Sequence, residues 1–148
     1  MPTVVRSRTV PARPEEVWDV ISDPYHLPRW WPRVERVEEV TPTAWTNVLR
    51  SPRGRIVRAD FTRTASVRPR HLAWRQEVEA SPFERVFAEI STEISIEPEG
   101  GGEARVELKA IHRLRGRSRF GAFMARRAAR RALDQALDGL GRAFGGEG

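Results

Sequence analysis

Cysteine is absent from this chain of 148 residues, which excludes disulfide bonds and thiolate metal sites. Long apolar runs are missing too, and none approaches the ~20 residues that a helix needs to span a bilayer. The N-terminal residues lack the apolar segment of a secretion signal. We therefore expect a soluble, cytoplasmic protein with a single domain, 1–148.

Recognisable catalytic and metal-binding motifs are also missing. No HExxH or GxSxG is present, and the histidines His26, His71 and His112 share no spacing typical of metal ligands. The glycines at 100–102 occupy a hairpin position instead of a phosphate-binding loop after a strand. The carboxylates fall mostly on strand positions that face solvent, which disfavours a hydrolase with paired acids. We predict neither a metal nor a cofactor.

Lysine is nearly absent, because Lys109 is the only one among 26 basic residues, and the net charge is +6. No acidic residue occurs between Leu108 and Leu133, where arginines are frequent. Some of these form i,i+4 pairs on one side of a predicted helix. The paired arginines are Arg126, Arg127, Arg130 and Arg131. They form a solvated face, or a surface for anionic lipid headgroups or nucleic acid phosphates. No nucleic-acid-binding motif accompanies them, so we expect no nucleic acid partner.

The segment 13–33 is the most informative part of the sequence. Pro14 suits the first position of a helix, and the acidic residues after it are favoured by the helix dipole. An apolar face follows at helical spacing until Pro24 ends the helix. Trp30 and Trp31 come next, and two adjacent indoles bury a large area. They form a lid over a cavity mouth, or they fill the core.

Turn residues divide the rest of the chain into strands and one long helix. Proline and glycine breakers separate segments of alternating polarity, and short connections favour an antiparallel meander. We expect strands near Thr3–Val10, Val34–Val40, Trp45–Ser51, Arg55–Val67, Leu72–Ala80, Val86–Ile96 and Ala104–Leu114. The expected short helices are Pro14–Ser22 and Tyr25–Trp30. This order predicts an α+β fold with a seven-stranded antiparallel sheet.

The last segment, about Ser118–Phe144, repeats its apolar residues every three to four positions, which predicts a helix. A helix of this length can cover the whole concave face of a curved sheet. Its predicted apolar face consists of Phe120, Phe123, Met124, Ala128, Ala132, Leu133, Ala136, Leu137 and Leu140.

The pattern as a whole resembles the START/Bet v 1-like (SRPBCC) superfamily, and within it the small bacterial proteins of polyketide cyclase/dehydrase type. The residues that carry the resemblance are Pro14, Glu16, Val17, Trp18, Ser22-Asp23-Pro24 and Trp30-Trp31-Pro32. The order of elements agrees along essentially the whole chain. The resemblance implies a helix-grip fold, in which the sheet wraps around the C-terminal helix and a cavity lies between them. That fold hosts binders, transfer proteins and enzymes.

Strand parity predicts which side chains point inward. In the segment 86–96, for example, the even positions are the inward set. A polar residue interrupts the apolar face of five strands, and these exceptions are Asn47, Arg63, Gln76, Thr92 and His112. A solid core must satisfy each of them, because a buried unpaired polar group costs ~1–3 kcal/mol. A hydrated or ligand-filled cavity removes that cost. Alternatively, some of them lie at strand ends or bulges and face water.

His112 is the best candidate for acid–base chemistry, because the pKa of a histidine lies near neutrality. A hydrogen-bonded structural role is the alternative. No catalytic motif of the family can be matched position by position, so whether the protein is an enzyme stays open. The resemblance implies polyketide cyclase or dehydrase activity, which would come mostly from shaping a reactive chain.

We predict that the protein binds a small apolar or aromatic molecule, polyketide or lipid-like, in an internal cavity. The predicted ligand-binding residues are Trp30, Trp31, Asn47, Phe61, Arg63, Trp74, Gln76, Ile90, Thr92, Leu108, His112 and Met124. One alternative is a non-enzymatic lipid or isoprenoid carrier that makes peripheral contact with anionic membranes. Another is a module that binds a protein partner. Both a monomer and a homodimer are compatible with the sequence.

Overall fold

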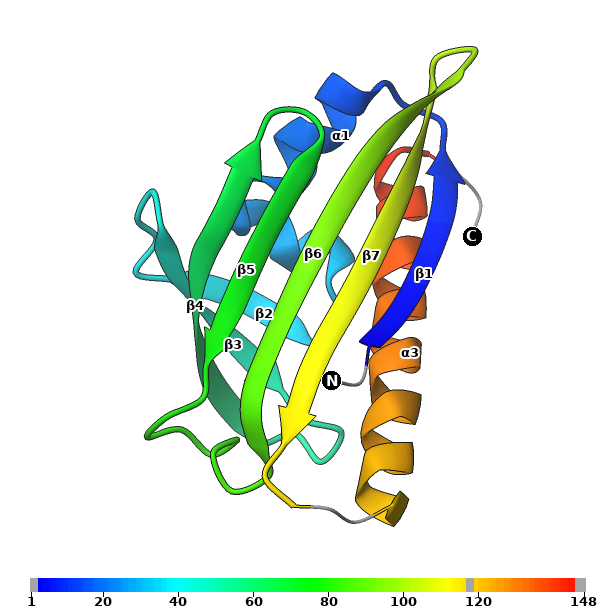
Figure 1. Cartoon of the computed structure of the whole chain (residues 1–148). Helices are drawn as coiled ribbons and strands as arrows, with labels where there is room; N and C mark the ends of the chain where they lie inside the picture. The colour runs from blue at the N-terminus through cyan, green and yellow to red at the C-terminus, as the bar shows by residue number, and fades with distance from the viewer. Residues whose placement is uncertain (1–2, 117–118, 146–148) are drawn as a thin grey trace.

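The computed structural model describes residues 3–116 and 119–145. Seven strands form one antiparallel sheet in the order β1-β7-β6-β5-β4-β3-β2. The strands are β1 (Thr3–Val10), β2 (Val34–Glu38), β3 (Ala44–Arg50), β4 (Ile56–Val67), β5 (His71–Glu77), β6 (Phe87–Gly100) and β7 (Glu103–Leu114). The helical elements are α1 (Pro14–Ile21), the 3-10 turn η1 (Pro24–His26), α2 (Leu27–Trp30) and α3 (Arg119–Ala143). The predicted α+β helix-grip fold is confirmed (Figure 1).

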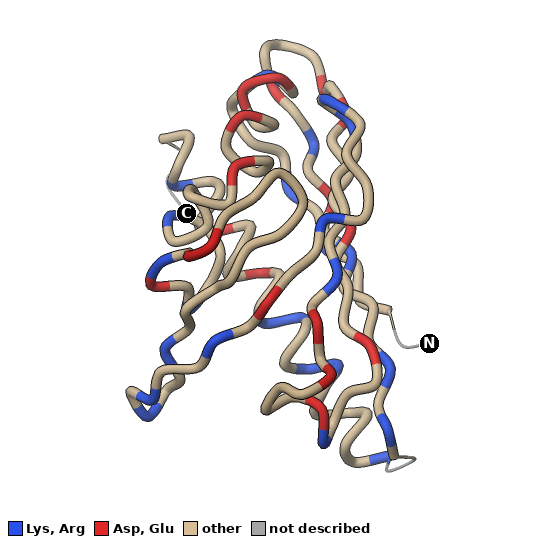
Figure 2. Tube along the Cα trace, turned by 90° about the vertical axis from the view of Figure 1, so that its left-hand side faces the viewer, with Lys and Arg blue, Asp and Glu red and all other residues tan. Residues whose placement is uncertain are grey.

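The short helices begin and end where the local chemistry predicts. Pro14 is the first residue of α1, and the Glu16 carboxylate accepts a hydrogen bond from the Arg13 backbone N–H at 3.1 Å. Asp23 then accepts from the Tyr25 backbone N–H at 3.0 Å, which starts η1. Acidic positions of α1 stand out at the top of Figure 2, and acidic and basic positions are interspersed along the strands.

One inward set differs from the prediction, because a bulge shifts the start of β6. The register between β6 and β7 changes between Phe87 and Glu89. An extra residue in one strand shifts the alternation by one position, so the side chains that precede the bulge point to the opposite face. Val86, predicted to point inward, precedes the strand and is 54% exposed. The Phe87 ring instead lies edge-on to the His112 ring, with centroids 6.1 Å apart.

The C-terminal half of α3 packs tightly against the rest of the molecule. Leu133, Leu137 and Leu140 are buried, and α3 contacts α2, β1 and β7. A Cβ atom added at Gly139 would lie 2.4 Å from the Trp30 carbonyl oxygen, so only glycine lets α2 approach α3 this closely.

The N-terminal half of α3 carries the predicted apolar face, but this part of the helix is not packed directly against the sheet. Phe120, Phe123 and Met124 are 74%, 57% and 45% exposed. Helical periodicity shows which side of a helix is apolar, but it does not show how far the neighbouring elements extend beneath it. Figure 1 shows α3 running past the β1 edge to the lower end of the molecule. The predicted first residue of this helix, Ser118, lies outside the described residues.

Candidate ligand-binding cleft

The strand register brings the predicted inward residues into rows across the sheet. Trp45 pairs with Phe61, Phe61 with Gln76, Gln76 with Ile90, and Ile90 with His112. These five residues therefore cross β3 to β7 in a single line. Gln76 and His112 share one face of the sheet, two strands apart.

The next row contains two further polar exceptions. Arg63 pairs with Trp74, Trp74 with Thr92, and Thr92 with Ala110, which lies opposite Val4 of β1. Thr92 is buried in this row and Arg63 is half-buried. The interruptions on different strands thus fall on neighbouring rows of one concave face.

A partly open cleft of about 610 Å³ lies between the sheet and the N-terminal half of α3. The sheet contributes Asn47, Leu49, Phe61 and Gln76. The connecting segments contribute Trp31, Pro32, Arg33 and Phe83. The helix α3 contributes Met124, Arg127, Ala128, Arg131, Ala132 and Gln135. Most of this lining is apolar, with a few polar side chains among the aromatic and aliphatic ones, as in typical binding sites for small molecules.

Aromatic rings form a continuous series behind the cleft. The Trp31 ring contacts Trp74 at a centroid distance of 5.5 Å, and Trp74 contacts Trp45 at 5.7 Å. Trp45 in turn stacks on Phe61 at 5.6 Å with an interplanar angle of 9°. Trp31 and Phe61 line the cleft at the two ends of this series, so the packed rings between them fix the position of its walls.

The adjacent tryptophans have separate positions. Trp30 is 2% exposed and lies in the hydrophobic core, where α2 meets α3. Trp31 is half-buried and lines the cleft. The two rings meet edge to face at 5.3 Å. Trp30 therefore fills the core, whereas Trp31 forms part of the cleft wall.

Two buried amides are the polar groups that the sheet contributes to the cleft. The Trp45 Nε1–H donates to Asn47 Oδ1 at 3.0 Å, which orients this amide. Gln76 is also buried, and its Nε2 has no hydrogen-bond partner among the described residues. Buried polar atoms in proteins are nearly always paired. An acceptor atom on a bound molecule would pair with Gln76 Nε2.

His112 is buried beside Phe87 and does not line the cleft. Its Nε2 has no hydrogen-bond partner within the described part of the chain. Burial lowers the pKa of His112, and the positive charge of Arg126 lowers it further. The imidazole is therefore neutral at pH 7, outside the cleft and in contact with an aromatic ring.

Several other predicted ligand-binding residues also lie outside the cleft lining. Arg63 Nη2 donates to the Ser22 carbonyl at 2.5 Å, which joins the end of α1 to the sheet. Burial lowers the pKa of Arg63, whose guanidinium lies 6.0 Å from the centre of the Trp45 ring. Leu108 is completely buried, and Thr92 and Trp74 are buried as well. The remaining residue outside the lining, Ile90, is half-buried.

The cleft also contains residues that sequence reasoning missed. Arg127, Arg131 and Gln135 follow one another at i,i+4 spacing and flank the small and apolar residues of α3 that face the sheet. The sequence places Arg127 and Arg131 with Arg126 and Arg130 on one side of the helix, but only Arg127 and Arg131 line the cleft. Their position at the border of the apolar stripe was the available signal.

The described residues contain no group of three or more His, Asp or Glu side chains arranged to hold a metal ion. Among these same residues, no helix is long and apolar enough to cross a membrane.

Known structures share this fold at low sequence identity. A START superfamily protein from Mycobacterium smegmatis matches with a TM-score of 0.79 and 14% identity, over 96% of each chain. The Zhui aromatase/cyclase from a Streptomyces species matches with a TM-score of 0.70 and 19% identity, over 97% of this chain and 90% of that one. The di-domain ARO/CYC protein BexL matches with a TM-score of 0.82 and 22% identity, over 96% of this chain and 46% of BexL.

A comparison with curated protein sequences finds no match. A family model described as polyketide cyclase / dehydrase and lipid transport matches residues 1–145. The match spans nearly the whole chain, including every strand of the sheet and the helix that forms the cleft wall. This protein therefore belongs to the polyketide cyclase / dehydrase and lipid transport family.

Proposed function

We propose that this protein binds a small apolar or aromatic molecule, polyketide or lipid-like, in the cleft between the sheet and α3. The observation that carries the proposal is the cleft of about 610 Å³, with an aromatic wall and eight apolar residues among the fourteen that line it. Trp31 and Phe61 offer ring surfaces, while Asn47 and Gln76 offer amides that can orient a polar atom of the ligand. Membership of the family supports this function.

The cleft favours binding and orientation of a ligand over acid–base catalysis. None of the described residues that line it is His, Asp, Glu, Lys or Tyr. The neighbours Zhui and BexL bear the names of aromatase/cyclases. If this protein also promotes a cyclisation, the chemistry rests on holding a flexible chain in a reactive shape, with Gln76 donating to a carbonyl oxygen.

The test is calorimetric titration with a library of apolar aromatic compounds. Ligand bound to the folded state stabilises it by ~2.7 kcal/mol at 100 times Kd, so a rise in melting temperature accompanies binding. Ala128→Trp should abolish the heat of binding, because the indole fills the cleft. The matched control is Phe123→Trp, which places an indole at a site on α3 outside the lining. An absence of binding across the library, or full binding by Ala128→Trp, would contradict the proposal.

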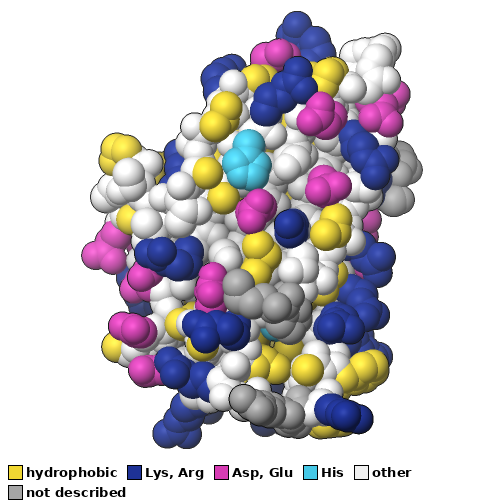
Figure 3. All heavy atoms as spheres, in the orientation of Figure 1, with side chains coloured by type: hydrophobic (Ala, Val, Ile, Leu, Met, Phe, Trp, Pro, Cys, Tyr) yellow, Lys and Arg dark blue, Asp and Glu magenta, His cyan; other side chains and the backbone are white. Residues whose placement is uncertain are grey.

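A second candidate function is peripheral binding to an anionic membrane. Phe120 and Phe123 are exposed side by side on the first turns of α3, next to the exposed guanidinium of Arg119. Apolar spheres are visible at this lower end of the molecule in Figure 3. Exposed aromatic residues beside cations are typical of helices that lie at a bilayer surface.

Co-sedimentation with vesicles tests whether these exposed side chains bind a membrane or only face solvent. Wild-type protein should pellet with phosphatidylglycerol vesicles and not with phosphatidylcholine vesicles. Phe120→Ser with Phe123→Ser should then remain in the supernatant. Wild-type protein that pellets with neither kind of vesicle would rule this candidate out.

A further inference from the structure

The charge in the cleft is of one sign. Three arginines, Arg33, Arg127 and Arg131, are among the described residues that line it, and no Asp or Glu is. No carboxylate of residues 3–116 or 119–145 lies within 4.0 Å of these guanidinium groups. All three arginines are exposed.

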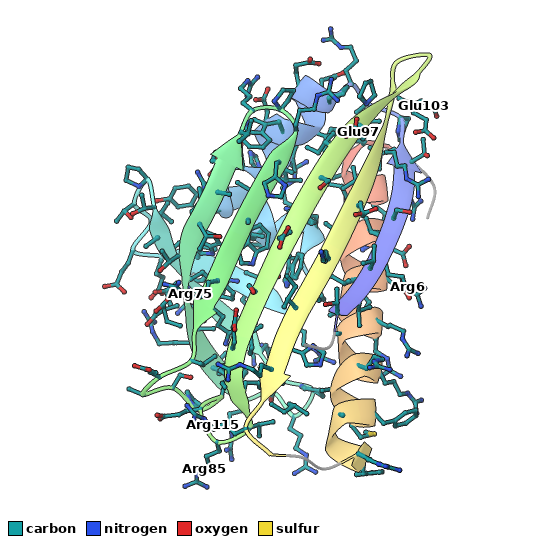
Figure 4. The ribbon with its side chains drawn as sticks, in the orientation of Figure 1. Arg6, Arg75, Arg85, Glu97, Glu103 and Arg115 are labelled. Atoms are coloured by element: carbon teal, nitrogen blue, oxygen red, sulfur yellow. The ribbon has the colours of Figure 1, made fainter. Side chains whose placement is uncertain are left out.

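Of the other 21 arginines in residues 3–116 and 119–145, ten form ion pairs with carboxylates. Arg58 lies 2.6 Å from a Glu38 oxygen, and Arg70 lies 2.8 Å from Glu97. Arg75, labelled in Figure 4, likewise lies 3.0 Å from Glu77 on the same strand. Many carboxylates are therefore present in the molecule, but none of the described Asp or Glu residues lines the cleft.

The cleft arginines come from two sides. Arg127 and Arg131 are one turn apart on α3, which places their side chains next to each other. Arg33 follows α2 and has a φ of 67°, a left-handed conformation that is uncommon for a residue with a side chain. The Arg50 backbone N–H donates to the Arg33 carbonyl at 3.0 Å and holds this turn in place.

The charged groups of the cleft are donors, and so is its buried unpaired atom among the described residues. Guanidinium groups donate and cannot accept, and two of them at i,i+4 repel each other. Gln76 Nε2, deeper in the cleft, is a further donor without a partner among the described residues. A ligand that complements this surface must therefore provide acceptor atoms and negative charge. Its body must be apolar to match Trp31, Phe61 and Met124.

We propose that the ligand of this cleft is an amphipathic organic acid, whose carboxylate is held by Arg127 and Arg131, with Arg33 beside it. This inference rests on the proposed binding function and specifies the class of ligand. A guanidinium can bind a carboxylate through two parallel hydrogen bonds, which are stronger than those between neutral groups. The apolar body lies against the aromatic wall, and an acceptor farther along it pairs with Gln76.

The experiment compares two probes of the same shape, 2-naphthoate and 2-naphthamide, by calorimetric titration at pH 7 and low salt. Wild-type protein should bind the carboxylate about tenfold more tightly than the amide, a modest factor because the arginines are exposed and screened by water. Arg127→Gln with Arg131→Gln should lower the affinity for the carboxylate more than the affinity for the amide, and so remove this preference. Glutamine is nearly as good a helix former as arginine, so α3 should remain folded.

The matched control is Arg126→Gln with Arg130→Gln. It removes the same charge from the same helix at positions outside the cleft lining. This variant should keep the preference for 2-naphthoate. If the control loses the preference as well, only the net charge of the protein attracts the anion, and the proposed carboxylate site is wrong.

The outcomes separate this inference from the function on which it rests. Equal affinity of wild-type protein for both probes would overturn the acid preference and leave apolar binding intact. Binding of neither probe would overturn this inference, and it would overturn the binding function as well only if the whole apolar library also failed to bind. Retention of the full preference by Arg127→Gln with Arg131→Gln would overturn the assignment of these two arginines. Circular dichroism and the melting temperature verify that each variant is folded.

Discussion

The two halves of α3 share one apolar periodicity but have different surroundings. From about Leu133 onward the stripe is buried against α2 and β1, and Gly139 touches the backbone of Trp30. Before that residue the same stripe faces a cleft, and Phe120 and Phe123 are exposed. One sequence pattern therefore serves as core in one half and as cleft wall in the other.

Charge distinguishes the halves as clearly as burial does. In the C-terminal half, Asp134 and Asp138 pair with Arg6 and Arg8 of β1, at 3.3 and 2.9 Å. The arginines of the N-terminal half have no carboxylate partner among the described residues. Figure 4 shows Arg85 and Arg115 near the same lower end, with Glu97 and Glu103 at the opposite end. A helix that is anchored at one end and unpaired at the other leaves room for a ligand at the unpaired end.

The largest expected difference between the halves is in packing. Leu140→Ala should lower the free energy of unfolding by about 2–5 kcal/mol, because this side chain is completely buried. Phe123→Ala in the N-terminal half should change it by less than about 0.5 kcal/mol. Urea denaturation of both variants measures the two values. Equal losses would show that the N-terminal half is packed as well.

A smaller effect is expected at the contact between α2 and α3. Gly139→Ala should destabilise the fold by about 1–3 kcal/mol, because the new methyl group meets rigid backbone of Trp30. Gly141→Ala is the control, since its methyl group would meet only the flexible end of Arg8. Thermal denaturation compares them. A Gly139→Ala variant that is more stable than the wild type would mean that α2 and α3 can move apart without loss of free energy of unfolding.

A pH-dependent effect is expected at His112, whose pKa is lowered by burial and by the charge of Arg126 in the N-terminal half of α3. Its pKa is about 6.5 in a flexible chain and lower in the fold, where burial and Arg126 disfavour the charged ring. Above pH 6.5 the ring is neutral in both states. As the pH falls below that value, the unfolded chain takes up the proton first, so stability decreases until the folded pKa is passed. Denaturation at pH 7 and pH 5 should therefore show a loss that is reduced in His112→Asn and slightly reduced in Arg126→Gln.

The smallest expected effect concerns the ion pairs. Asp138→Asn should cost about 0.2–1 kcal/mol at low salt and less at 1 M salt, as expected for a partly exposed pair. Arg130→Gln in the unpaired half should cost nothing measurable. A salt-dependent loss in Arg130→Gln would reveal a partner for that residue.

The fold was predictable because its local signals agree with one another. β1 was predicted at its exact bounds, and Pro14 and Pro24 mark the helical elements that follow it. Strand parity also predicted that Asn47 and Gln76 point inward, and both line the cleft. These features depend on neighbours in sequence or on the two-residue period of a strand.

The rest of the site could not be predicted, because it depends on how elements far apart in the sequence pack against one another. The bulge at Phe87 reversed the inward set at one strand end. The position of Trp31 in the cleft and of Trp30 in the core follows from how α2 meets α3 at Gly139. Arg127 and Arg131 differ from Arg126 and Arg130 by one position each, and only the orientation of the helix separates them.

The pairing of β1 with β7 has a consequence for synthesis on the ribosome. Ser7 lies opposite Glu107, so about 100 further residues must be synthesised before the strand that pairs with β1 exists. At ~5–20 residues per second this interval lasts several seconds, during which β1 has no strand to pair with. The hairpin of β6 and β7 supplies that partner late, and such non-local closure slows folding. The sheet, and with it the surface against which α3 packs, is therefore expected to be completed late in the synthesis and folding of the chain.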